Sequence, residues 1–100
     1  MDSIHSPGVE MIRRERDRQI DNYGVEHDDE HVSEELARAA ACLSTPVLYR
    51  QYAVMVSMWP WRPHEFQSGD RVEDLVRAGA LIAAEIDRLI RLKEKRSGQS

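Results

Sequence analysis

Cysteine is almost absent from this sequence, which has one, Cys42, among 100 residues. A single thiol excludes an internal disulfide and a cysteine-based metal cluster, and it fits a reducing compartment. No apolar run approaches the roughly 18 residues of a membrane span. The first residues also lack the basic region followed by an apolar one that marks an export signal. We therefore expect a soluble cytoplasmic protein with no membrane association.

Glycine-rich and lysine-rich stretches, which would suggest a phosphate site, are also missing. Basic residues do gather near the end of the chain, but they follow an expected helix C-terminus, where positive charge complements the helix dipole. No aromatic residues alternate with them, so direct binding of nucleic acid is not expected. These basic residues are Arg88, Arg91, Lys93, Lys95 and Arg96.

The net charge is −4, and it is unevenly distributed. Residues 1–35 hold eleven acids and four arginines, whereas residues 36–100 hold seven acids and ten basic residues. Residues 25–35, called here the acidic segment, contain six carboxylates and no Lys or Arg. An exposed surface of that density would repel phosphates and attract proteins that bind them.

The strongest structural signal lies between Asp70 and Leu92. Asp70 can cap a helix, and Glu73, three residues later, can complete a capping box. The mid-helix Gly79 suggests close approach of a neighbouring backbone. Helical spacing places the apolar residues on one stripe, which we expect to face the core: Val72, Leu75, Val76, Gly79, Ile82, Ala83, Ile86, Leu89 and Ile90.

A first helix is predicted from Pro7 to Asn22, with Ser6 as its cap and Gly24 as its stop. Its apolar arc, made by Val9, Ile12, Ile20 and Tyr23, has Arg16 at the centre. A buried guanidinium needs a carboxylate. Glu85, at the flank of the later apolar stripe, is the expected partner, so we predict a structural ion pair between Arg16 and Glu85.

A second, alanine-rich helix is predicted from Glu30 to Leu43, capped by Asp29 or Ser33. Pro46 is expected to start a short helix, followed by an extended piece to Met58. The Trp59-Pro60-Trp61 segment cannot be regular structure. The fold class is therefore all-α: one domain over residues 1–100, with frayed ends at 1–6 and 94–100, forming a bundle of three helices or four.

His27 and His31 have ligand chemistry at a spacing of four residues and are surrounded by acids, which would suit a divalent metal. We favour an acidic loop and helix start instead, with no bound metal or cofactor. Helical metal-dependent nucleotide pyrophosphohydrolases hold magnesium with carboxylates on facing helices, and Glu34, Glu35 and Glu85 could be arranged that way. That enzyme is the alternative hypothesis. Nucleophilic catalysis is not expected, because Cys42 has no obvious paired base.

Trp59 and Trp61 either cover the core or anchor a binding partner. Pro60 between them fixes their relative direction, and a rigid aromatic pair is typical of interface hot spots. The expected partner-binding residues combine this pair with the acidic segment and the end of the first helix: Tyr23, Glu26, His27, Asp28, Asp29, Glu30, His31, Trp59 and Trp61.

Five stretches of this sequence together resemble a family of small phage and prophage proteins, and within it the type I-F anti-CRISPR proteins. They are Glu15-Arg16 with Arg18-Gln19-Ile20, His27-Asp28-Asp29 with His31, Glu35-Leu36-Ala37 with Ala39-Ala40, Trp59-Pro60-Trp61, and the pattern from Asp74 to Ile86.

The resemblance implies a phage-encoded inhibitor that acts in the bacterial host. It would bind the protein subunits of a crRNA-guided surveillance complex at their basic DNA-binding surface and prevent capture of target DNA. On this hypothesis the acidic segment would imitate DNA phosphates, and the protein would not be an enzyme.

Overall fold

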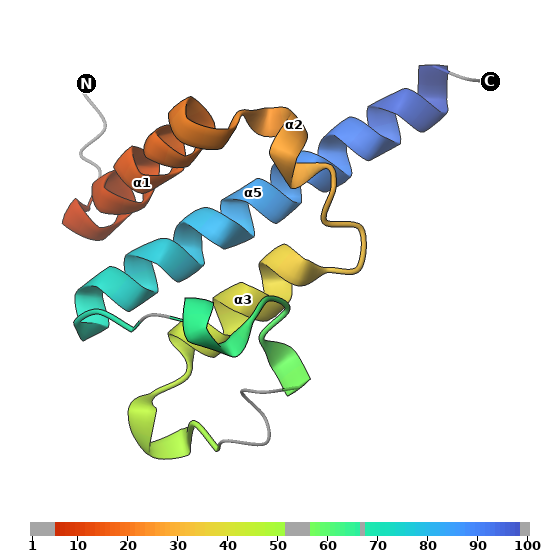
Figure 1. Cartoon of the computed structure of the whole chain (residues 1–100). Helices are drawn as coiled ribbons and strands as arrows, with labels where there is room; N and C mark the ends of the chain where they lie inside the picture. The colour runs from red at the N-terminus through yellow and green to blue at the C-terminus, as the bar shows by residue number, and fades with distance from the viewer. Residues whose placement is uncertain (1–5, 52–56, 67, 99–100) are drawn as a thin grey trace.

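The computed structural model describes residues 6–51, 57–66 and 68–98. Within these ranges every regular element is helical, which confirms the predicted all-α fold (Figure 1). Three longer helices, α1 (Pro7–Tyr23), α3 (Glu35–Ser44) and α5 (Arg71–Gly98), are joined by the short helix α2 (Val25–Asp28) and by two 3₁₀ turns, η1 (Val47–Tyr49) and η2 (Pro63–Glu65). None of the described helices is long and apolar enough to cross a membrane.

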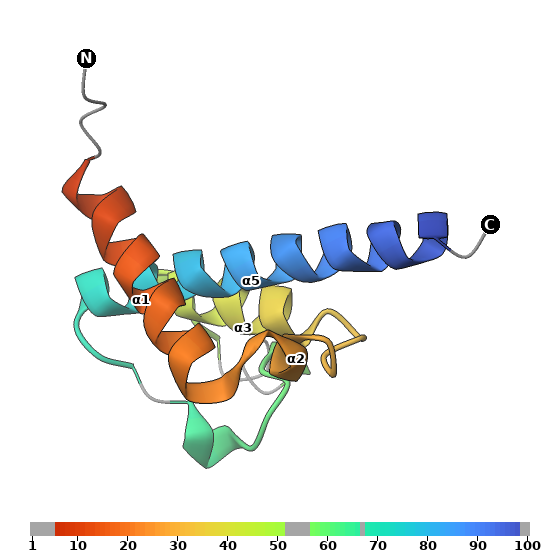
Figure 2. The same ribbon diagram turned by 90° about the horizontal axis from the view of Figure 1, so that it is seen from above.

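Helix α5 is the element against which the others pack. It contacts α1, α2 and α3. Figure 1 shows α1 and α3 on opposite sides of it, and in Figure 2 the upper side of α5 carries no described helix along most of its length. The molecule extends 46 × 40 × 22 Å, so it is thin in one direction.

Capping residues set the bounds of α1 and α5, as the sequence predicts. The Ser6 hydroxyl accepts a hydrogen bond from the Val9 amide, and Pro7 opens the helix. Gly24, at φ 76°, ends α1 one residue later than predicted, in a conformation that favours glycine. Asp70 accepts from the Glu73 amide and starts α5.

The C-terminal bound of α5 differs from the prediction. The helix continues to Gly98, so residues 94–98 are helical and the predicted fraying there is wrong. Lys93 to Arg96 are good helix formers, and Lys95 and Arg96 suit the negative end of the helix dipole. Ser6 is also ordered, as the cap of α1, whereas residues 1–5 and 99–100 lie outside the described residues.

Helix α3 begins at Glu35, five residues after the predicted start, and neither Asp29 nor Ser33 caps it. Glu34 precedes it with φ 61°, and the Glu35 carboxylate accepts from the Ser33 amide at 2.6 Å. The helix does not start at Glu30 with Asp29 as its cap, because the Asp29 carboxylate binds Arg91 on α5.

The connection between α3 and α5 partly matches the prediction. Pro46 precedes the short turn η1, as expected, and Trp59 to Trp61 are irregular, also as expected. Most of the predicted extended piece lies outside the described residues, which resume at Ser57, but its last two residues, Ser57 and Met58, are helical, so the prediction is wrong there.

The core of the described residues is small and unlike the predicted one. Leu36 and Leu43 on α3 are buried, and Leu43 packs in one cluster with Ala40 and with Ala78 of α5. The aliphatic stripe predicted as the core face is about half exposed at Val72, Leu75, Ile82, Ile86, Leu89 and Ile90, so that prediction is wrong. Alanines let α3 and α5 approach closely, and this contact decides which face is buried. The buried alanines are Ala39, Ala40, Ala78, Ala80 and Ala84.

Charged groups make up much of the remaining buried surface. Asp74, 1% exposed, accepts hydrogen bonds from the Ser68 hydroxyl at 2.6 Å, the Gly69 amide at 2.9 Å and the Arg77 guanidinium at 2.9 Å. Burial raises the pKa of Asp74, but these hydrogen bonds outweigh it and hold the pKa below the ordinary 3.8. Asp74 therefore attaches the chain before α5 to the helix itself.

Gly79 marks a close approach, as predicted, but by a side chain of α1 rather than by backbone. A Cβ at this position would lie 2.6 Å from Cδ1 and 2.9 Å from Cγ1 of Ile12. In a helix isoleucine is stiff at χ1 and cannot easily move away. Gly79 thus allows α1 to cross α5 at this point.

We predict that Gly79→Ala lowers the free energy of unfolding by about 1 kcal/mol or more, although helix propensity alone would raise it by about 1 kcal/mol. Ile12→Ala removes Cδ1 and both γ carbons, so Gly79→Ala should cost much less in the Ile12→Ala background than in the wild type. Urea denaturation of the wild type, both single variants and the double variant measures this. A stabilised Gly79→Ala single variant would contradict the steric argument.

Candidate functional site

Six aromatic rings from three separate segments form one continuous row, called here the aromatic row. Tyr23 stacks on His27 with centroids 5.3 Å apart, and His27 meets His31 edge-on at 5.1 Å. His31 then contacts Trp61 at 5.5 Å, Trp61 contacts Trp59 at 5.2 Å, and Trp59 contacts Phe66 at 4.9 Å. Five of the six are residues that the sequence predicted for partner binding, so the fold brings these five together.

The row changes from exposed to buried along its length. Tyr23 is 62% exposed, and the His27 side chain is 46% exposed, whereas the His31 side chain is 12% exposed. Trp59 is half-buried, and its indole N–H donates to the Arg62 carbonyl at 3.1 Å. The Tyr23 end is therefore accessible to a partner, while the Trp59 end is held by the chain itself.

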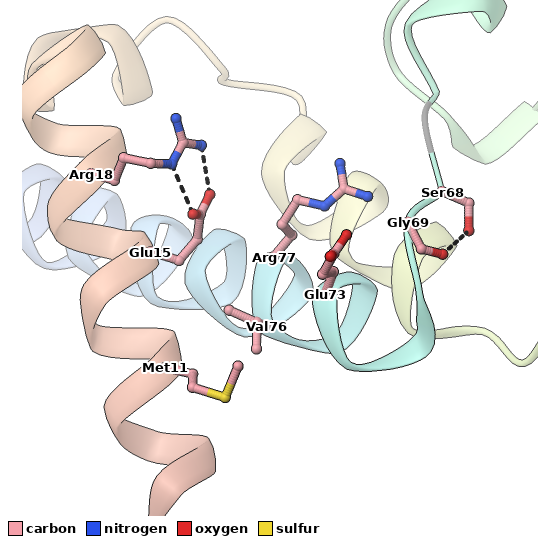
Figure 3. Close-up of a pocket in the computed structure, with 8 residues that line it drawn as sticks. All are labelled: Met11, Glu15, Arg18, Ser68, Gly69, Glu73, Val76 and Arg77. Carbon is pink, nitrogen blue, oxygen red and sulfur yellow. Dashed lines mark hydrogen bonds and ion pairs between the residues drawn. The ribbon is translucent and has the colours of Figure 1, made fainter.

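A cavity of about 550 Å³ lies along this row. Its lining combines the rings with apolar residues of α3 and α5, and with the Glu15–Arg18 pair of α1. Arg18 donates to Glu15 at 2.7 and 2.8 Å, and these bonds lower the pKa of Glu15. The same pair also borders a second hollow of about 420 Å³ between α1 and the start of α5, shown in Figure 3. The pair thus separates two concave surfaces.

Asp28 is buried, although the sequence predicted that it lies on an exposed loop. It is 7% exposed and ends α2, with its Oδ2 at 3.1 Å from Arg16 Nη1. This contact lacks hydrogen-bond geometry, and the buried Oδ2 has no hydrogen-bond partner. The prediction that Asp28 lies on an exposed acidic surface is therefore wrong, because α2 turns this carboxylate inward toward α1.

Asp29 is also engaged within the chain. Its Oδ1 accepts from Arg91 of α5 at 2.8 and 3.2 Å, and this hydrogen bond holds the pKa of Asp29 below the ordinary 3.8. Glu26 and Glu30, in contrast, are exposed beside His27. The acidic segment thus presents fewer free carboxylates than its sequence suggests.

The predicted ion pair between Arg16 and Glu85 is wrong, although both residues are buried at 7% exposure. Arg16 hydrogen-bonds Asp87 at 3.1 and 3.4 Å and pairs with Asp28. Glu85 accepts two hydrogen bonds from Arg88, one turn further along the same helix, at 2.7 and 3.0 Å. Each charge interrupting an apolar face does have a partner, but a local pair on α5 satisfies Glu85.

The histidines stand near carboxylates without binding them. His27 Nδ1 lies 3.8 Å from Glu30 Oε2, and His31 Nδ1 lies 3.9 Å from Glu35 Oε2. Across the described part of the chain, no three His, Cys, Asp or Glu side chains are grouped so that they could hold a metal ion.

Phe66 and Arg77 are site residues that the sequence did not single out, and Glu15 entered only through the family resemblance. Phe66 completes the row and also lies under Arg50, whose Cζ is 5.7 Å from the ring centroid. An isolated Phe in an irregular stretch gives no periodic signal, so its position depends on how the connection folds. Arg77 and Glu15 lie on the polar sides of their helices, where the sequence predicts only solvent-exposed side chains.

No protein-family model, no curated protein and no solved structure matches this chain. The family resemblance drawn from the sequence therefore stays a prediction.

We predict that Arg16→Met costs about 3 kcal/mol of stability, because it leaves the buried Asp28 carboxylate without its counter-charge. In a double-mutant cycle, Arg16→Met and Asp28→Asn should couple by 1 kcal/mol or more, since they share one contact. Arg16→Met and Glu85→Gln should instead add within about 0.5 kcal/mol. Chemical denaturation of the six proteins, wild type included, measures both cycles. Strong coupling between Arg16→Met and Glu85→Gln would instead support the predicted ion pair between Arg16 and Glu85.

Acid should destabilise the fold through Asp29. Its pKa is lower in the folded protein, so its contribution is complete above the ordinary value of 3.8 and is lost as pH falls through the lower folded value. We expect the free energy of unfolding to fall less steeply below about pH 4 in Asp29→Asn than in the wild type. Val32→Ala, at a neighbouring exposed position, is the control and should keep the wild-type slope. Equal slopes in Asp29→Asn and the wild type would contradict the role of Arg91.

Proposed function

We propose that this protein is a non-enzymatic inhibitor that binds another protein through the exposed end of the aromatic row and the carboxylates beside it. The supporting observation is their juxtaposition: Tyr23 and His27 stack in an exposed position, and Glu26 and Glu30 are exposed next to them. Aromatic anchors next to charges are the arrangement that protein interfaces use for affinity and for orientation.

The chemistry of this surface favours a basic partner. Rigid rings lose little entropy on binding, while the two glutamates attract lysine and arginine over a Debye length of roughly 8–10 Å. The type I-F crRNA-guided surveillance complex, which the sequence resemblance implies, has such a surface where it binds DNA. We propose this complex, in the cytoplasm of the bacterial host, as the partner and prevention of DNA capture as the effect.

The acidic mimicry is smaller in this proposal than the sequence suggested. Asp28 and Asp29 hold the segment in place by binding Arg16 and Arg91, so they order the surface instead of contacting the partner. A loop held by packed helices can present its remaining charges in fixed positions. Glu26 and Glu30 are thus the residues that would replace DNA phosphates.

A metal-dependent nucleotide pyrophosphohydrolase is the second candidate. The cavity along the aromatic row, bordered by Arg18 and Arg77, is the observation that favours it, because rings and guanidinium groups suit a base and phosphates. The carboxylates it would need are less suitable: Glu85 binds Arg88, and Glu35 accepts from the Ser33 amide. We therefore rank the inhibitor first.

We expect Glu30→Lys to weaken binding to the purified surveillance complex about tenfold and to flatten its salt dependence, because the reversed charge faces a basic surface. Tyr23→Ala should cost a similar factor through lost contact area. Biolayer interferometry at two salt concentrations measures this, together with protection of the complex from target DNA.

Glu94→Lys is the matched control, since Glu94 is exposed far from the row, and it should change affinity less than twofold. Full binding by Glu30→Lys and by Tyr23→Ala would contradict the proposed surface. Hydrolysis of nucleoside triphosphates by the wild type with magnesium, abolished by Arg77→Ala, would favour the enzyme instead.

A further inference from the structure

Helix α5 carries a long apolar face that the described residues leave about half exposed, except at Gly79, where Ile12 of α1 packs on it. Its six large aliphatic side chains are each between 45% and 54% exposed. They follow one another at steps of three, seven, four, three and one residues, and the step of seven spans Gly79, where α1 crosses. This is the spacing of a seam that packs against another helix. The six are Val72, Leu75, Ile82, Ile86, Leu89 and Ile90.

The opposite face of the same helix is the buried one, with small and charged residues such as Ala80, Ala84 and Arg88 against the rest of the protein. On α5, Ala78, Ala80 and Ala84 are therefore buried, whereas Ile82, Ile86 and Ile90 are exposed. It exposes 7286 Å² in total, whereas a compact monomer of 11.5 kDa is expected to expose about 5800 Å². In Figure 2 no described helix lies above α5 along most of its length.

We propose that a second copy of this chain covers this face, with the two α5 helices packed antiparallel and Ile82 and Ile86 at the centre. Half-exposed aliphatic side chains offer on the order of 80 Å² each, so two copies would bury on the order of 1000 Å² from these alone, which reaches the size of a specific interface. A self-complementary patch of this kind is what a two-fold dimer needs.

Charge selects the antiparallel direction. Lys93 and Arg96 continue the apolar face at its C-terminal end, so a parallel pair would bring like charges together. An antiparallel pair instead places them beside the first turn of the other α5 and so keeps these like charges apart. Arg71, in that first turn, donates to the carbonyls of Leu43, Ser44 and Thr45 at the end of α3.

The antiparallel register follows from the spacing. If Ile82 faces Ile86 of the second copy, then Leu75 faces Lys93 of that copy. In an antiparallel pair, facing residues share one midpoint in the sequence, and both of these pairs have their midpoint at Ala84. Lys93 can lay its aliphatic stem on Leu75 and extend its ammonium into solvent. Steric and electrostatic preferences thus agree on one arrangement.

Sedimentation equilibrium of the full chain should show a dimer at micromolar concentration, and Ile86→Asp should shift it to a monomer by weakening association at least a hundredfold. Leu48→Asp is the matched control: Leu48 is 93% exposed but lies on η1, so this variant should remain dimeric. Circular dichroism shows whether Ile86→Asp stays helical. Ile86→Asp unfolds only if the single subunit is unstable without its partner. In that case the melting temperature of the wild type should rise with protein concentration.

A monomeric wild type at high concentration, or a dimer that Ile86→Asp leaves intact, would overturn the proposal. If the wild type is monomeric and a different protein binds over the α5 face, the face belongs to that interface and the dimer proposal is wrong.

Direction is tested by cross-linking in a Cys42→Ala background. A mixture of chains carrying Leu75→Cys and chains carrying Lys93→Cys should form the mixed disulfide on oxidation, whereas Lys93→Cys alone should not cross-link. Efficient cross-linking of Lys93→Cys with itself would show a parallel pair and overturn the antiparallel arrangement.

Discussion

The guanidinium of Arg16 is the point on which the site depends. It lies on α1, hydrogen-bonds Asp87 of α5 and pairs with Asp28 of α2, so one side chain joins three helices. Because it is buried, its charge must be neutralised, and the turn of α2 that brings Asp28 inward is the consequence. Arg91 repeats the arrangement one turn further along α5 by binding Asp29. These two arginines fix the position of His27 and His31, and with them the middle of the aromatic row.

The small number of large apolar side chains in the core explains the rest of the architecture. With its largest aliphatic side chains on the outer face of α5, the chain fills its interior with alanines and with charged pairs such as Arg88–Glu85 and the Asp74 cluster. Buried ion pairs contribute little net stability but tolerate no loss of one partner. A subunit built in this way has a small margin of stability of its own, and the proposed association through α5 would supply the burial that the single chain lacks.

Local signals in the sequence were enough for the helical class, for the caps at Ser6 and Asp70, and for the stop at Gly24. They also placed five rings of the row among the candidate residues. They failed where a long-range contact decides. Helical periodicity identifies an apolar face without saying whether this chain covers it, so the α5 stripe was assigned to the core. Charge counting likewise could not show that Arg16 and Arg91 occupy Asp28 and Asp29, and a pairing within one helix, Arg88 with Glu85, was overlooked in favour of one between helices.

The central claim is that arginines of α1 and α5 order the segment that carries the proposed binding surface. Amide hydrogen exchange in an Arg16→Met/Arg91→Met variant tests it most directly. We expect amides of residues 25–31 to exchange at least tenfold faster than in the wild type, with α3 and the middle of α5 nearly unchanged. Unchanged exchange in residues 25–31, or an equal acceleration across all helices, would contradict the claim.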